Sequence, residues 1–147
     1  MKSLAAVAVA AATLAALATG QEAVAAPTAP TGSAGPVITC GTPGAPGTLL
    51  TRACVEVTGN QVRFYGIAAT TNSGWQPQQV GFTVSGTVVG GAPIAPINPT
   101  VLVQAGTTSV GSIVTTAPCG STVNGSFSVN QWGWPPSTAT VSAVVSC

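Results

Sequence analysis

The fold of this chain is decided by residues 49–69, which read LLTRACVEVTGNQVRFYGIAA. Apolar and polar side chains alternate on both sides of Gly59-Asn60, and a period of two is typical of a half-buried β-strand. A Gly-Asn pair between two such runs favours a two-residue hairpin loop, here as a type II′ turn. We therefore expect antiparallel strands over 49–57 and 61–69.

The register of this hairpin places Val55 opposite Phe64, so that the apolar residues share one face of the strand pair. Glu56 then lies directly opposite Arg63 on the other face, where Arg52 also lies. Cross-strand ion pairs of this kind contribute about 0.2–1 kcal/mol. Strand pairing therefore gives each of these charges a structural explanation.

A second hairpin is indicated near the carboxyl end of the sequence. Residues 121–129 and 138–147 alternate in the same way, with a Trp-rich loop between them. Folding these two runs about Gly133 places Phe127 opposite Ala139.

Four cysteines, an even number, fit two disulfides in an exported protein. The second hairpin brings Cys119 to Cys147, and a short Gly/Pro loop separates Cys40 from Cys54. We predict these two local pairings among the three that four cysteines allow, each stabilising the fold by about 2–4 kcal/mol. A zinc site is the alternative, but the sequence contains no C-x-x-C pair.

Further short strands are expected over 37–39, 80–89, 101–104 and 108–115. The segment 90–99 contains three prolines, which favour a crossover or rim loop over a strand interior. About seven or eight short antiparallel strands in one domain point to an all-β immunoglobulin-like sandwich. A barrel is the alternative.

The amino-terminal residues 1–25 have the features of a secretory signal peptide. Lys2 precedes an Ala/Leu/Val run, and Ala23-Val24-Ala25 fits the small-x-small cleavage rule. Residues 26–35 are expected to form a flexible tail and 36–147 the sandwich domain. We expect no membrane-spanning segment after the leader, and a protein that is secreted or associated with the cell surface.

Three formally charged side chains follow the predicted leader, Arg52, Glu56 and Arg63, and the sequence has no histidine or aspartate. Acid–base and nucleophilic catalysis depend on such groups, and one glutamate supplies neither a catalytic triad nor the carboxylate pair of a glycosidase. The same scarcity argues against a metal site and against a nucleic-acid partner. We therefore expect a non-enzymatic protein without a cofactor.

Aromatic residues in predicted loops are the candidates for recognition. Trp75 lies in the turn-like segment 70–77, and Trp132 and Trp134 flank a glycine in the second hairpin loop. Such rings can stack on sugar faces or anchor a protein interface. Tyr65 is a further candidate, which we expect to project from the face that carries the charged residues. We therefore expect neutral surface recognition of a polysaccharide or of another surface protein. The alternative is that the tryptophans fold back and cap the open end of the sandwich.

Two other functions are left open by the composition. Low charge weakens the repulsion between copies, which favours a self-associating coat or matrix protein of the cell surface. The second of these functions is that of an inhibitor, or of a carrier that binds a small apolar ligand in the mouth of the sandwich.

The segment RACVEVTGNQVRFYGIA at 52–68, with Cys40 before it, a late cysteine pair and an Ala-rich leader, resembles small exported immunoglobulin-like β-sandwich proteins of actinobacteria. The resemblance covers most of the chain after the leader and implies fold and export. Those proteins largely lack an assigned activity, so it carries over no functional residue. Antibiotic-carrying sandwiches of the neocarzinostatin type are similar in size, leader and number of disulfides, but this sequence departs from their short cysteine spacings.

Overall fold

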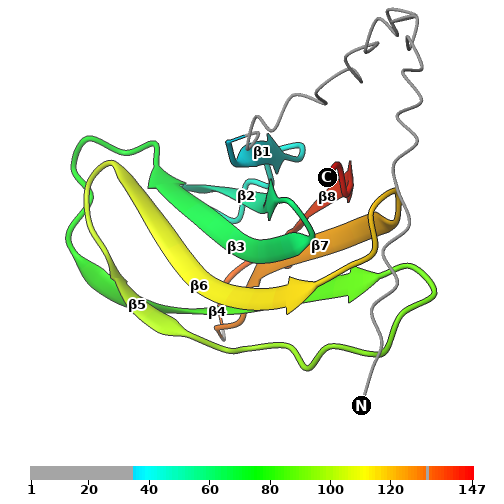
Figure 1. Ribbon diagram of the computed structural model, residues 1–147. Helices are drawn as coiled ribbons and strands as arrows, with labels where there is room; N and C mark the ends of the chain where they lie inside the picture. The colour runs from blue at the N-terminus through cyan, green and yellow to red at the C-terminus, as the bar shows by residue number, and fades with distance from the viewer. Residues whose placement is uncertain (1–34, 132) are drawn as a thin grey trace, which may run out of the picture. The chain divides into compact units, whose positions relative to one another are not determined.

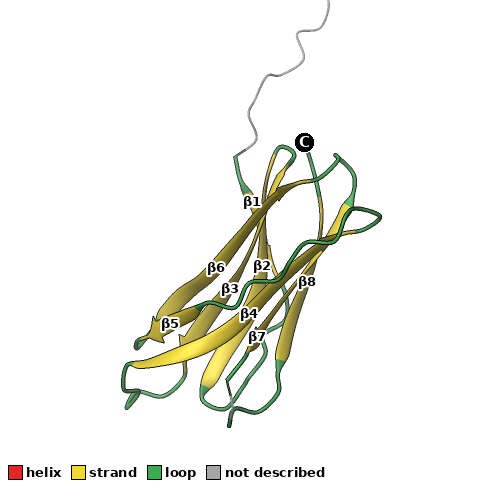
Figure 2. Ribbon diagram, turned by 90° about the horizontal axis from the view of Figure 1, so that it is seen from below, coloured by secondary structure: helices red, strands yellow, loops and turns green. Residues whose placement is uncertain are grey.

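The computed structural model describes residues 35–131 and 133–147. Within them the chain forms strands and no helix, and two antiparallel sheets pack face to face (Figures 1 and 2). The prediction of an all-β antiparallel fold is thus confirmed. The predicted signal peptide at 1–25, the tail at 26–35 except Gly35, and Trp132 lie outside the described residues.

Eight strands make up the two sheets. They are β1 (Val37–Cys40), β2 (Leu49–Thr58), β3 (Gln61–Thr70), β4 (Gln78–Val88), β5 (Thr100–Val103), β6 (Thr107–Thr116), β7 (Thr122–Val129) and β8 (Thr138–Val144). The first sheet has the order β1-β2-β3-β6 and the second the order β5-β4-β7-β8. The chain therefore crosses between the sheets after β3, after β5 and after β6.

Both hairpins have the predicted register. In β2–β3, Val55 pairs with Phe64 and Glu56 pairs with Arg63. Gly59 in the connecting turn has a φ of 58°, a conformation that glycine adopts without a steric penalty.

In β7–β8, Phe127 pairs with Ala139 as predicted. The last strand ends at Val144 and not at Cys147, because β7 begins at Thr122, which is the partner of Val144. Beyond the strand, Val145 still accepts a backbone hydrogen bond from Gly120 and donates one to Ser121, which precede β7.

Two disulfides form, with the predicted pairings. Cys40 and Cys54 are directly opposite each other in β1–β2, with 4.1 Å between their Cα atoms. Cys119 and Cys147 join the segments that flank the second hairpin, with 5.6 Å between their Cα atoms. Two disulfides are consistent with an oxidising environment.

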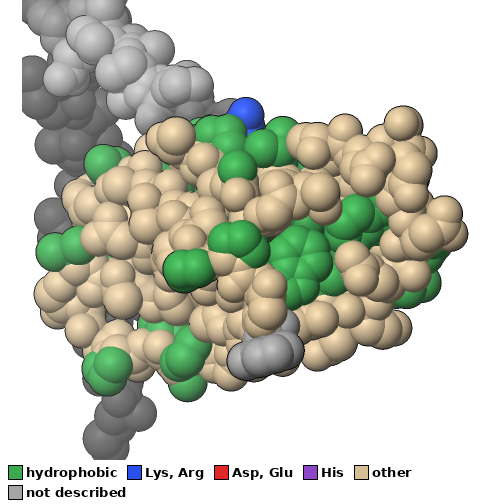
Figure 3. Space-filling model, turned by 180° about the vertical axis from the view of Figure 1, so that it is seen from behind, with side chains coloured by type: hydrophobic (Ala, Val, Ile, Leu, Met, Phe, Trp, Pro, Cys, Tyr) green, Lys and Arg blue, Asp and Glu red, His purple; other side chains and the backbone are tan. Residues whose placement is uncertain are grey.

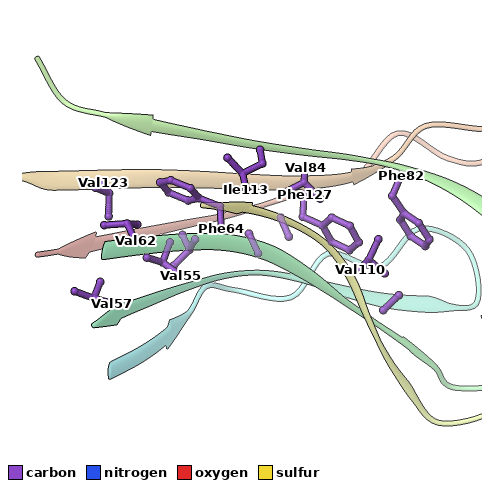
Figure 4. Packing of buried hydrophobic residues seen from close by; sticks show 14 of the residues in the cluster. Val55, Val57, Val62, Phe64, Phe82, Val84, Val110, Ile113, Val123 and Phe127 are labelled. Atoms are coloured by element: carbon purple, nitrogen blue, oxygen red, sulfur yellow. The ribbon is translucent and has the colours of Figure 1, made fainter. Parts of the chain in front are cut away.

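The core lies between the sheets and is built from valines around three phenylalanine rings (Figure 4). Phe82 and Phe127 stack within the second sheet, with ring centroids 5.0 Å apart and planes inclined by 17°. Phe64 of the first sheet is 1% exposed and faces glycines of the second. Burial of these side chains is the main source of stability, because each removes a large apolar area from water.

A bulge in β6 keeps its apolar residues on the core side. Gly111 and Ser112 together lie opposite Tyr65, so that Val110 and Ile113 both point inward. Gly111 has a φ of 66°, the left-handed conformation found at glycine in such bulges. The predicted strand over 108–115 is correct, but simple alternation would have placed either Val110 or Ile113 outside.

Two glycines mark close contacts between chain segments at the edges of the sandwich. On one side a Cβ atom at Gly41 would overlap the carbonyl oxygen of Thr140 on β8. On the other side Gly111 packs against Ile97 and Pro99 of the proline-rich crossover. No helix in the part of the chain that the structure describes is long and apolar enough to cross a membrane.

Candidate functional site

The outward face of β4, β7 and β8 presents three rows of uncharged polar side chains. The inward positions of the same strands are filled by core residues, so strand alternation leaves hydroxyl and amide groups to solvent. Antiparallel pairing aligns these groups across the strands, about 4.8 Å apart, with about 7 Å between rows. The rows are Thr83–Ser128–Thr138, Ser85–Ser126–Thr140 and Thr87–Asn124–Ser142.

Two of these rows line a groove of about 480 Å³. Gly125 lies between them on β7, and its inward side is in contact with the core, where an added Cβ would lie 3.1 Å from the ring of Phe64. The hydroxyl groups of Ser85 and Ser126 are 2.7 Å apart and hydrogen-bonded, which orients both of them. We call this surface, with all three rows, the neutral face.

Amide side chains extend the neutral face towards the loop between β7 and β8. Thr83 Oγ1 donates a hydrogen bond of 2.8 Å to Asn98 Oδ1, and Asn130 Nδ2 donates one of 3.0 Å to the same oxygen. The backbone amide of Gly81 donates to Gln131 Oε1 at 3.0 Å. These contacts fix the amide groups without satisfying all of their donors and acceptors.

The charged residues lie on the opposite sheet. Arg63 Nη1 is 3.1 Å from Glu56 Oε2, and Arg63 Nε donates a hydrogen bond of 2.9 Å to Ser112 Oγ. Exposed pairs of this kind are worth about 0–1 kcal/mol. Tyr65, which we expected to project from this face, is only 9% exposed, and the Arg63 guanidinium lies 4.8 Å from its ring centroid. The sequence places no formal charge on any strand of the second sheet.

Figure 3 shows one face of the molecule, seen from behind relative to Figure 1. In Figure 3 the visible surface consists mainly of uncharged polar side chains and backbone, with apolar groups between them. Basic atoms are confined to the rim of this view.

Trp75 and Trp134 are half buried and pack against the core. Trp75 Nε1 donates a hydrogen bond of 3.0 Å to the carbonyl oxygen of Val103. The two ring centroids lie 6.4 Å apart with planes inclined by 53°, and a Cβ atom added at Gly47 would lie 3.5 Å from the Trp134 ring. This packing gives both rings a structural role at one end of the sandwich. Ligand contact through Trp75, Trp132 or Trp134 stays a prediction.

The neutral face suits a ligand that is itself uncharged and rich in hydroxyl groups. Each hydroxyl or amide can both donate and accept, so a polyhydroxyl ligand can satisfy these groups in either sense. An ionic ligand would find no opposite charge on this face. An apolar ligand would remove water from the polar groups without replacing their hydrogen bonds, which costs about 1–3 kcal/mol for each group. Among the described residues, no three His, Cys, Asp or Glu side chains come together as a metal site.

Sequence reasoning identified the hydroxyl groups only as solvated strand surface. Their alternation at 83–87, 124–128 and 138–142 is visible in the sequence. The missing information was that β4 lies beside β7, a pairing between segments far apart in the chain. Comparison with protein-family models, curated proteins and solved structures finds no match.

Proposed function

We propose that this protein is a secreted, non-enzymatic β-sandwich that binds a neutral polysaccharide through the neutral face. The observation that carries the proposal is the in-register array of hydroxyl and amide groups on a sheet without formal charge. A polysaccharide offers repeated hydroxyl groups along an extended chain. Many individually weak hydrogen bonds then add up, although each contributes only about 0.5–1.5 kcal/mol.

A protein partner fits the neutral face less well. The centres of protein interfaces are enriched in aromatic residues, Met and Arg, and are depleted in Ser. The three rows contain Ser, Thr and Asn, and no aromatic or charged side chain. We therefore place the polysaccharide ahead of a surface protein.

The strand order supports an immunoglobulin-like assignment and the resemblance to exported actinobacterial sandwiches. In immunoglobulin domains strand B lies beside E, and strand C lies beside F, which forms a hairpin with G. Here β3 lies beside β6, and β4 lies beside β7, which forms a hairpin with β8. Export is supported by the leader pattern and by two disulfides.

Retention on insoluble neutral polysaccharides tests the proposed function. We expect the protein to bind at least one of cellulose, chitin, xylan or mannan, and the Asn124→Ala/Ser126→Ala/Ser142→Ala variant to lose retention. The matched control is Thr58→Ala/Ser109→Ala, which removes exposed hydroxyl groups from the first sheet. Absence of retention on every polysaccharide, or equal retention of the two variants, contradicts the proposal.

Self-association as a coat or matrix protein is the second candidate, and edge strands favour it. Ile38 on β1, Val114 on β6 and Val144 on β8 are 57%, 57% and 60% exposed. Apolar side chains on edge strands promote pairing between copies. Light scattering at low salt separates the two candidates, because a polysaccharide binder stays monomeric as its concentration rises.

A further inference from the structure

A second cavity, chemically unlike the neutral face, lies under the proline-rich crossover at 89–99. Its volume is about 430 Å³, within the range of about 300–1,000 Å³ that is common for small-molecule sites. The crossover leaves the end of β4 and returns along the same strand towards β5 (Figure 1). The cavity therefore opens between the two sheets, beside the end of β6.

The inner wall of the cavity continues the hydrophobic core. Val88 and Ile94 line it, and both are half buried against core residues. Pro93 and Pro118, which are both exposed, add apolar surface to the lining. An apolar ligand would therefore extend the core and gain stability from the same loss of water contact.

Backbone hydrogen bonds fix both ends of the crossover above the cavity. The amide of Gly91 donates to the carbonyl of Val88 at 2.9 Å. Further along, Ile97 and Val84 exchange two backbone hydrogen bonds of 3.0 Å. The segment between these anchors contains Pro93 and Pro96, whose fixed φ limits its collapse.

The opposite wall is equally constrained. The hydroxyl of Ser121 donates a hydrogen bond of 2.6 Å to the carbonyl of Pro118. Next to it, Ala117 donates its amide to Asn60 at 2.9 Å, and Cys119 is held by its disulfide. A preformed pocket loses less entropy on binding than one that must be ordered.

The lining residues also indicate which class of ligand the pocket can bind. The lining residues carry no formal charge. Thr115 is half buried and lies on the inward side of β6, as Ile113 does. A partner strand is disfavoured, because the prolines of the crossover offer no amide hydrogen for pairing. We propose that this pocket binds a small, uncharged, mostly apolar molecule with one polar group that reaches the Thr115 hydroxyl.

The neutral fluorophore N-phenyl-1-naphthylamine, used with the secreted protein, tests the proposal. We expect saturable binding with a rise in probe fluorescence, excited where tryptophan does not absorb. Ala95→Trp and Ala92→Trp each fill the cavity from an exposed position and should abolish the signal. Ala105→Trp, exposed in the loop between β5 and β6, is the matched control and should bind as the natural protein does.

Two blocking variants guard against a folding defect, and near-ultraviolet circular dichroism shows which of them keeps the native packing. A lack of saturable binding by the natural protein overturns the proposal. So does binding by a folded blocking variant that equals binding by Ala105→Trp. The outcome is independent of polysaccharide retention, because the neutral face lies on the outer side of the second sheet and the pocket on its inner side.

Discussion

The ring of Phe127 on β7 packs directly onto the backbone of Gly66 on β3. A Cβ atom at Gly66 would overlap the ring carbons of Phe127. Phe64, also on β3, lies in the same way against Gly86 of β4 in the opposite sheet. Each ring thus occupies the place of a missing side chain across the core, and this complementarity fixes the distance between the sheets.

Gly66→Ala should lower the free energy of unfolding by about 1–3 kcal/mol, because the added methyl group overpacks the core against Phe127. Urea denaturation measures the change. The control Gly74→Ala, in a loop where the nearest atom is a side-chain oxygen at 3.4 Å, should stay within about 0.5 kcal/mol of the natural protein. Adding Phe127→Leu to Gly66→Ala should recover part of the loss, and strict additivity of the two changes would contradict the contact.

Gly111→Ala should be more destabilising than Gly59→Ala. Both glycines have similar left-handed φ values, 66° and 58°, so both substitutions carry the same backbone penalty of about 1–2 kcal/mol. Only Gly111 is crowded, since its Cβ would lie 2.9 Å from Val84 Cγ2 and 3.1 Å from Ile97 Cδ1. The difference between the two variants in thermal or urea unfolding therefore isolates the packing of the bulge. An equal loss of stability in the two variants would mean that the crossover moves away from the added methyl group without cost.

The hairpins were predictable because their information is local. Alternation around Gly59-Asn60 determines the pairing of Val55 with Phe64, and a shift of one residue would expose the core face. The bulge at Gly111 was not predictable in this way, because an extra residue in β6 is defined only against its partner β3. In the sequence its one sign is a glycine within a strand pattern.

The candidate site was harder to predict for the same reason. The neutral face exists because β4 lies beside β7, and the sequence shows no pattern that selects this neighbour. The loop position of Trp75 favours exposure to solvent, yet its indole N–H donates a hydrogen bond to the carbonyl oxygen of Val103, and its half-buried ring packs against the core. A buried Trp usually needs such a partner, which only the tertiary structure supplies.

Thr51→Val should stabilise the protein by about 1 kcal/mol. Thr51 is fully buried on β2, and its hydroxyl has no hydrogen-bond partner in the described part of the chain. A buried hydroxyl without a partner costs about 1–3 kcal/mol, and valine has the same shape without the polar group. Thr51→Ser, which keeps the hydroxyl and loses a methyl group, is the control and should destabilise. A lower melting temperature for Thr51→Val would show that the hydroxyl is satisfied, for example by a buried water molecule.

Retention on a neutral polysaccharide should not depend on salt. Salt screens interactions between charges, and neither the neutral face nor such a ligand carries any. The amount retained is therefore expected to be equal at about 0.01 M and about 1 M sodium chloride, which differ about tenfold in screening length. Arg52→Gln serves as the control, because Arg52 is exposed on the first sheet. If salt elutes the protein, or if Arg52→Gln weakens retention, then the ligand contacts the charged side of β2 and β3, and the assignment to β4, β7 and β8 is wrong.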